Sequence, residues 1–215
     1  MIKISLLKFY LITFILSISL YSVGNTENEF PLDPAINYGK LENGFTYYIR
    51  ENQTPKDKVS IKLIIKAGSI MEEENQLGLA HLLEHMAFNG SKNFPKRKID
   101  EYMSSIGLNI GSHYNASVGF LKTNYVYEIP TNNDDDVEVA LKILTDISKN
   151  LSLEPEAFER ERKIVEEEWR TDIGGSKNYI NEFHKVMFKN SRFNERKPIG
   201  TLDIIQNFKY QDAID

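Results

Sequence analysis

The sequence predicts an α+β fold, in which an antiparallel or mixed sheet packs against helices and a metal site lies between two of those helices. Three observations support this prediction. Segments with the two-residue alternation of strands are interleaved with segments of helical periodicity. One helical segment contains a His-x-x-Glu-His sequence, and another carries two glutamates on its apolar stripe. The chain of 215 residues is long enough for one domain with a substantial core.

The N-terminal residues are typical of a secretory signal peptide. Lys3 and Lys8 precede an apolar run from Phe9 to Val23, and Ser22-Val23-Gly24 has the small residues of a cleavage site. We therefore assign residues 1–24 to a signal peptide and expect a secreted or periplasmic protein. A membrane anchor is the less favoured alternative, because the apolar run is short for a membrane span. After cleavage, no stable membrane span is expected.

The composition limits the expected partners. Removing the signal peptide takes away two lysines and no acidic residue, which changes the formal charge from −5 to −7. Lys96-Arg97-Lys98 is the longest basic block, so we do not expect nucleic acid as a partner. The chain has no cysteine and therefore forms no disulfide.

Periodicity and turn residues then place the elements in order. Residues 25–37 are a polar, proline-containing lead-in, and the predicted domain spans 38–215. Strands are predicted at 41–50, opened by Asn43-Gly44, at 58–67, and at 111–118 and 122–129, which form a hairpin. Helices are predicted at 77–88, 96–106, 134–149 and 155–172, and Thr201 is suited to cap a further one. The helical pattern continues up to Asp215 without a stop signal, which indicates truncation at the C-terminal end.

The sequence from His81 to His85 is the strongest functional signal. With about 3.6 residues per turn, His81 and His85 lie one above the other on the same helical face, and Glu84 lies on the flank of that face. The alternative is a pair of ordinary core histidines. The surrounding apolar residues make burial of three ionisable groups costly unless a cation pairs with them. Two imidazoles can hold Zn²⁺, and the adjacent carboxylate can then take a proton from water.

A zinc site with two histidines needs a further protein ligand. In a chain without cysteine, the candidates are His113, His184 or a carboxylate. In the helix predicted at 155–172, Glu161 and Glu168 fall within an apolar arc. The apolar members of this arc are Ala157, Phe158, Ile164, Val165 and Trp169. The glutamates outside the arc suit a solvated helical face; they are Glu159, Glu166 and Glu167. Glu161 and Glu168 therefore need a partner, which favours a functional role.

These residues resemble a known signature. His81-Leu82-Leu83-Glu84-His85, followed by Glu161 and Glu168 in Glu-Arg-Lys-Ile-Val-Glu-Glu-Glu-Trp, is similar to the inverzincin motif of the pitrilysin/insulinase family of zinc metallopeptidases. The resemblance extends over roughly residues 35–215. Further segments that carry it are Tyr38–Tyr48, Lys66-Ala67-Gly68-Ser69, Asn115-Ala116 with Thr123 and Tyr125, and Pro198-Ile199-Gly200-Thr201.

The resemblance implies a zinc-dependent endopeptidase, a hydrolase that cleaves peptides with metal-activated water. The implied zinc ligands are His81, His85 and Glu168, with Glu84 as general base and Glu161 as the outer acid that orients a ligand histidine. The peptide substrate would lie along the sheet near Asn115 and Ala116. We expect Tyr125 and Tyr127 to serve hairpin packing, and His113 and His184 to be ordinary residues.

The family also suggests a partner. Its members resemble a tandem of related halves, or paired subunits, that close around the peptide, and this chain resembles the first, metal-bearing half. The alternatives are a non-catalytic peptide-binding or partner subunit of a two-part protease, or an inactive fragment of a longer peptidase. Glu84 favours the enzyme, because a scaffold has no need of a base there.

Overall fold

The computed structural model describes residues 31–171 and 175–214. The predicted signal peptide at residues 1–24 lies outside these ranges. The chain divides into two compact units, one that ends at Thr54 and one that begins at Pro55. Within the described ranges, no helix is both long enough and apolar enough to span a membrane. The α+β class predicted from the sequence is confirmed, with antiparallel sheets throughout the described residues.

The first unit contains one antiparallel hairpin. Strand β1 (Ile36–Lys40) pairs with β2 (Thr46–Arg50). The Asn43 side chain accepts a hydrogen bond from the backbone N–H of Phe45 at 3.0 Å, and Gly44 has a φ of +87°, which favours glycine. The prediction of one strand over 41–50 was therefore wrong at its start, since this turn separates two strands. Strand β1 also begins inside the range predicted as the lead-in.

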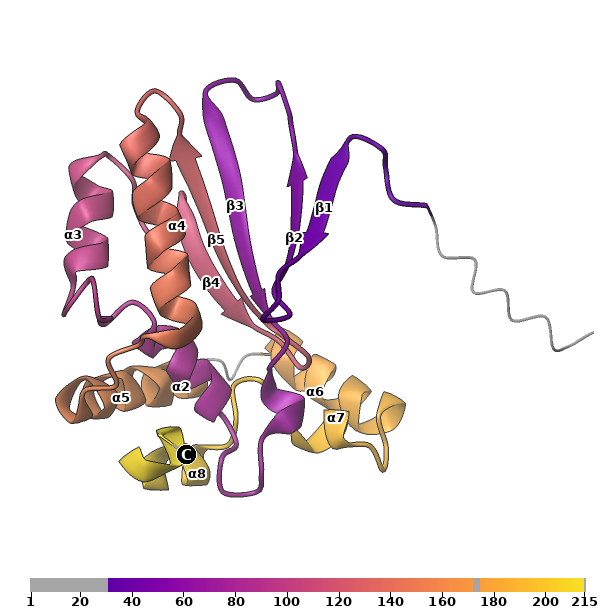
Figure 1. Cartoon of the computed structure of the whole chain (residues 1–215). Coiled ribbons are helices and arrows are strands. Elements are labelled where there is room, and N and C mark those ends of the chain that lie inside the picture. Colours follow the sequence, from indigo (N-terminus) through magenta and orange to yellow (C-terminus); the bar gives the residue numbers. More distant parts are fainter. Residues whose placement is uncertain (1–30, 172–174, 215) are drawn as a thin grey trace, which may run out of the picture. The chain divides into compact units, whose positions relative to one another are not determined.

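The second unit is built on a three-stranded antiparallel sheet. Its order is β3 (Lys58–Ile65), β5 (Thr123–Pro130) and β4 (Tyr114–Val118), so β4 lies at an edge. Helix α4 (Asp134–Lys149) covers one face of this sheet (Figure 1). Side chains from the sheet and α4 form the larger apolar cluster, which includes Leu63, Tyr125, Tyr127, Ile129, Ala140, Ile143, Leu144 and Ile147. The hairpin and the packing role of its tyrosines are confirmed.

A smaller apolar cluster holds the helices of the predicted metal site together. Helix α2 (Leu79–Met86) packs against α5 (Pro155–Thr171), and α5 packs against α8 (Leu202–Asn207). The buried members of this cluster are Leu79, Leu82, Met86, Ala157, Phe158, Val165, Ile205 and Phe208. Apolar burial of this kind contributes roughly 1.5–3 kcal/mol for each large side chain. Apolar packing therefore fixes the position of α2 relative to α5.

The remaining helices include two that were not predicted. Helix α3 (Lys98–Ser105) confirms the prediction at 96–106, whereas α6 (Gly175–Met187) and α7 (Arg192–Glu195) had no counterpart in the prediction. Two 3₁₀ turns, η1 (Ser69–Met71) and η2 (Tyr210–Ala213), complete the described elements. Thr201 precedes α8 at the N-cap position, but its side chain makes no capping hydrogen bond.

Asp146 fixes the loop that follows α2 onto helix α4. Its side chain is 1% exposed and accepts hydrogen bonds from the Ser91 hydroxyl, the Asn93 backbone and side-chain amides, and the Asn150 side chain. Burial opposes ionisation, but these four donors outweigh it and lower the pKa of Asp146 to about 2. The carboxylate is therefore ionised and saturated with donors.

We predict that Asp146→Asn lowers the free energy of unfolding by about 2–4 kcal/mol, because the amide turns a donor toward groups that are themselves donors. The depressed pKa of Asp146 stabilises the folded state above pH 3.8, and this contribution is lost as the pH falls toward 2. Urea titration at pH 7 and at pH 3 measures both effects. The exposed Asp135 on the same helix supplies the control variant Asp135→Asn. Equal stability of the two variants would contradict the prediction.

Candidate metal centre

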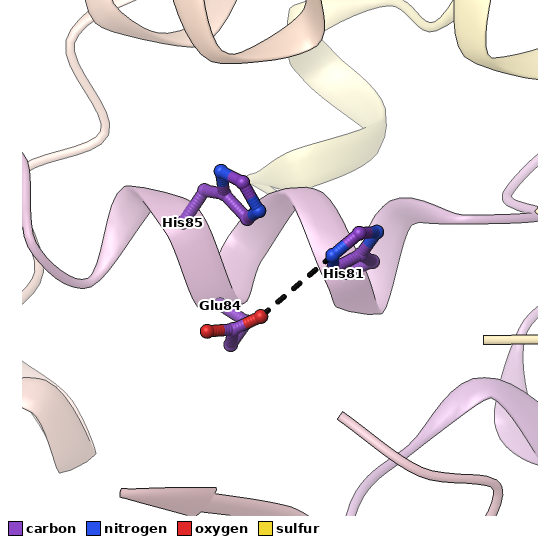
Figure 2. A group of neighbouring side chains, drawn as sticks. All are labelled: His81, Glu84 and His85. Carbon is purple, nitrogen blue, oxygen red and sulfur yellow. Dashed lines mark ion pairs between the residues drawn. The ribbon is translucent and has the colours of Figure 1, made fainter. Parts of the chain in front are cut away.

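Helix α2 carries both histidines on its accessible face. It begins after Gly78, whose φ is +100°, and its side chains Leu79, Leu82 and Met86 are buried on the opposite side. Figure 2 shows His81, Glu84 and His85 on consecutive turns of this helix. One ligand atom from each of these three residues lies within 4.8 Å of the other two. The spacing predicted from the sequence therefore gathers all three groups.

Helix α5 brings a carboxylate to the same place. Glu168 Oε2 lies 3.4 Å from His81 Nε2 and 3.5 Å from His85 Nε2. The Nε2 atoms of both imidazoles therefore face a single carboxylate oxygen from a helix that is distant in the sequence. Such a convergence places three potential metal donors around one point.

The donor set fits zinc. Zn–N and Zn–O bonds of roughly 2.0–2.2 Å in a tetrahedral site put neighbouring donors about 3.4 Å apart. The two distances from the glutamate oxygen to the imidazole nitrogens, 3.4 Å and 3.5 Å, match that separation. Two imidazoles and one carboxylate are also the three protein ligands of many catalytic zinc sites, which leave a fourth position for water. His81, His85 and Glu168 could therefore hold the ion.

Glu161 contacts His85 and not the point where the three potential donors meet. Its Oε2 is 3.4 Å from His85 Nδ1, on the side of the ring away from Glu168, and its Oε1 is 3.6 Å from Arg160 Nε. Burial opposes the charge of Glu161, but the His85 bond, an Asn89 contact and Arg160 outweigh it, so its pKa is lowered. An ionised Glu161 can hold the His85 ring with Nε2 turned toward Glu168.

The two imidazoles have different acid–base properties. Burial, with a smaller effect from the charge of His85, lowers the pKa of His81 to about 4, so this ring is neutral at neutral pH. For His85 burial acts in the same direction, but the Glu161 bond and the charges of Glu168 and Glu84 outweigh it and raise the pKa. The Nδ1 atom of His81 is buried without a hydrogen-bond partner among the described residues.

Glu84 lies beside His81 and has a raised pKa. Its side chain is largely buried, and its Oε2 lies 3.8 Å from His81 Nε2 (Figure 2). Burial raises the pKa of Glu84; the His85 charge opposes this shift and the Glu168 charge adds to it. A carboxylate with a raised pKa beside a metal-binding position is a better acceptor of a proton from water than an ordinary surface glutamate.

The apolar arc predicted on α5 is only partly buried. Glu161 is 7% exposed, as expected, but the Glu168 side chain is 45% exposed and Ile164 is 41% exposed. The Glu166 side chain, predicted to be solvated, is only 17% exposed and pairs with Arg170. The reason is that the Glu168 and Ile164 side chains face an open cleft and do not enter a packed core. The orientation of Glu168 was predicted correctly, whereas its burial was not.

The cleft has a volume of about 540 Å³ and contains the whole cluster. Asn115 and Ala116 of the edge strand β4 line it, together with the metal-site residues. The sequence analysis gave no role in the site to several residues of its wall, which are Phe88, Asn89, Arg97, Asp100, Ile110, Arg160 and Ile164. These residues carry no motif, and only the folding of α3, α5 and the 106–113 loop onto the site reveals them. The cleft joins the metal cluster to an exposed strand edge.

The other two histidines lie elsewhere. His113 accepts a hydrogen bond at Nδ1 from the backbone N–H of Asn109 at 3.1 Å. His184 packs among aromatic rings, including Phe120 and Phe188. Neither histidine belongs to the cluster or lines its cleft, so neither meets His81 and His85 as Glu168 does.

Comparisons with known proteins agree with this geometry. Residues 47–196 match the family model "Insulinase (Peptidase family M16)". The chain belongs to the insulinase family of peptidases. It is 35% identical to the probable zinc protease PqqL of Haemophilus influenzae over 206 residues, which cover 94% of this chain and 22% of that protein. The insulinase-family resemblance seen in the sequence is therefore confirmed.

Solved structures show the same fold. The chain superimposes on the crystal structure of the periplasmic protease PqqL from Escherichia coli with a TM-score of 0.82 and 32% identity, over 86% of this chain and 20% of that one. It covers 39% of a structure of the first half of the same protease, again with a TM-score of 0.82. The chain thus spans about one fifth of the length of these relatives. The PqqL proteins of both species are named probable zinc proteases, in agreement with the donor set.

We predict that Glu161→Gln weakens zinc binding about 10–100-fold, because the neutral side chain orients His85 less firmly. The same substitution should lower the pKa of His85 in the metal-free protein, since the anion that raises it is removed. A competitive chelator titration at pH 8 and an NMR titration of the histidine ring measure the two effects. Glu159→Gln, on an exposed position of α5, is the matched control and should leave both values unchanged.

Proposed function

We propose that this chain is the metal-bearing part of a zinc-dependent endopeptidase, with His81, His85 and Glu168 as the zinc ligands. The observation that carries the proposal is the meeting of both Nε2 atoms at one oxygen of Glu168, at distances of 3.4 Å and 3.5 Å. Neither helix could form the centre alone, because each supplies only part of the donor set. Bound Zn²⁺ would lower the pKa of a water molecule and polarise the scissile carbonyl.

Glu84, Glu161 and His81 have different roles in the proposed reaction. Glu84 takes a proton from the attacking water and passes it to the leaving amine, a role that suits its raised pKa. Glu161 keeps the His85 ring oriented through Nδ1. His81, with its lowered pKa, presents an unprotonated nitrogen at neutral pH. The cluster thus contains the ligands, an orienting acid and a base.

The exposed edge of strand β4 is the proposed binding site for an extended peptide. The N–H of Ala116 bonds to the Asn115 side chain at 3.0 Å rather than to the neighbouring strand, so the backbone at this position faces away from β5. Asn115 and Ala116 both line the cleft that holds the cluster. An extended peptide can add to this edge by main-chain hydrogen bonds and place a peptide bond beside Glu84.

The complete enzyme is proposed to be larger than this chain. The similar PqqL proteases are more than four times as long, and a structure of the first half of one of them is known. We propose that a homologous second half or partner subunit closes over the cleft, so that residues 38–215 act as the N-terminal part of the peptidase. The signal-peptide pattern at residues 1–24 and the periplasmic location of the similar E. coli protease support a secreted or periplasmic location.

The ligand assignment predicts one zinc ion per chain. His81→Ala and Glu168→Ala should each weaken zinc binding by at least about 100-fold, because losing a ligand costs more than losing an orienting group. Elemental analysis and chelator competition on the purified chain measure this. Glu167→Gln, the exposed neighbour of Glu168, is the control and should bind zinc like the wild type. Absence of zinc from the wild type, or full affinity in His81→Ala, would refute the assignment.

The proposed role of Glu84 as the base predicts a result that differs from that of the ligand variants. Glu84→Gln should keep its zinc but lose peptide hydrolysis by about 100-fold or more, since it removes a proton acceptor and no ligand. Fluorogenic peptide cleavage should be assayed with this chain alone and together with the remaining part of the protease. Hydrolysis at the wild-type rate by Glu84→Gln would show that another group accepts the proton.

A further inference from the structure

Glu72 is a buried acid that the proposed chemistry does not use. It lies directly after the 3₁₀ turn η1, is 6% exposed, and does not line the cleft that holds the metal cluster. Its carboxylate instead spans the start of helix α2: Oε2 accepts a hydrogen bond from the N–H of Gly78 at 3.0 Å, and Oε1 accepts one from Ala80 at 2.8 Å. Both oxygens are therefore committed to the first turn of the helix that carries the histidines.

This contact replaces an ordinary helix cap. The N-cap residue of α2 is Gly78, which has no side chain to cap the free N–H groups. Helix α2 has only 8 residues, so its first turn is a large part of it, and short helices are marginal without tertiary support. His81 belongs to that first turn and directly follows Ala80. Any fraying there moves the His81 imidazole relative to Glu168.

Glu72 is itself held in place from a distant part of the chain. Its carbonyl oxygen accepts hydrogen bonds from Arg192 Nη2 and from Arg196 Nε, both at 2.8 Å. Arg196 is 3% exposed, and its own carbonyl accepts a bond from the buried Ser69 hydroxyl at 2.6 Å. The segment around helix α7 thus fixes the backbone of Glu72, and the Glu72 side chain fixes the start of α2.

The backbone before helix α2 has little room to move. A Cβ on Gly200 would come within 2.3 Å of the Leu77 carbonyl oxygen, so the 199–201 loop packs directly against the residue before Gly78. Burial raises the pKa of Glu72 to about 7, although the Gly78 and Ala80 amides and Arg196 oppose this shift. Keeping an acid here has a free-energy cost that an exposed cap would not have.

We propose that Glu72 is a positioning residue of the metal centre, whose two-oxygen bridge to the Gly78 and Ala80 amides sets the place of His81 opposite Glu168. The proposal rests on the zinc ligands assigned above. Glu72 touches neither the metal position nor the peptide cleft, so it acts only through the helix. Its loss should change the geometry of the centre, and not merely the stability of the fold.

The test is Glu72→Gln in the full chain, because the amide keeps one acceptor oxygen but turns a donor toward the second N–H. We expect zinc affinity to fall about tenfold, as for other outer groups that orient ligands. We also expect the visible absorption of the Co²⁺-substituted protein to change in position or intensity, since that spectrum reports ligand geometry. The control is Asn133→Ala, which removes the side-chain cap of α4 and should lower stability while leaving both metal readouts as in the wild type.

A folded Glu72→Gln with wild-type zinc affinity and Co²⁺ spectrum would overturn the proposal, as would equal changes in Asn133→Ala. If Glu72→Gln does not fold, Arg192→Ala decides in the same way. This variant removes the bonds from an exposed arginine to the Ile70 and Glu72 carbonyls, and should weaken zinc binding about threefold with the same spectral trend. Zinc binding that His81→Ala leaves intact would instead refute the ligand assignment itself.

Discussion

The packing of one short helix against one long helix determines whether the metal centre exists. The imidazoles come from α2 and the carboxylate from α5, so a shift of about 1 Å between the helices would move the donors out of reach of a common ion. Leu82 and Met86 on the back of α2 are fully buried against a cluster that includes Phe158 and Val165 of α5. The apolar cluster behind the histidines therefore sets the distances in front of them.

Four ionisable groups in this small region are driven in different directions by their surroundings. Burial is the largest effect at His81 and Glu84: it lowers the pKa of His81, which loses its proton easily, and raises the pKa of Glu84, which accepts a proton readily. At His85 and Glu161, their mutual hydrogen bond with the nearby charges outweighs burial and favours the ion pair. Environments that separate the proton affinities of neighbouring groups are characteristic of acid–base sites.

The sequence was sufficient for the parts of the site that depend on local periodicity. The i, i+4 spacing of His81 and His85, and the seven-residue spacing of Glu161 and Glu168, place these groups on single helical faces. The two faces meet as expected. The helix predicted at 134–149 likewise agrees with α4, for which Asn133 is the N-cap residue. Boundaries set by turn residues were less certain, as the strand at Thr46 shows, because Asn43-Gly44 can open a strand or join two.

Contacts between distant segments that carry no motif could not be predicted from the sequence. No pattern indicates that Glu72 caps a helix six residues later, or that Arg192 and Arg196 hold it, because these contacts arise only when the fold brings the segments together. The exposure of Glu168 was missed for a related reason: helical periodicity identifies a face but does not distinguish a packed interior from the wall of a cleft.

The assembly of the site from separate helices has a thermodynamic consequence. A bound ion would act as a cross-link between His81 and Glu168 in a chain that has no cysteine for any covalent one. Since the unfolded chain holds no such arrangement, binding would favour the folded state by RT ln(1 + [Zn²⁺]/Kd), which is about 2.7 kcal/mol at a hundredfold excess over Kd. The resistance of this protein to unfolding would then follow the supply of free metal in its surroundings.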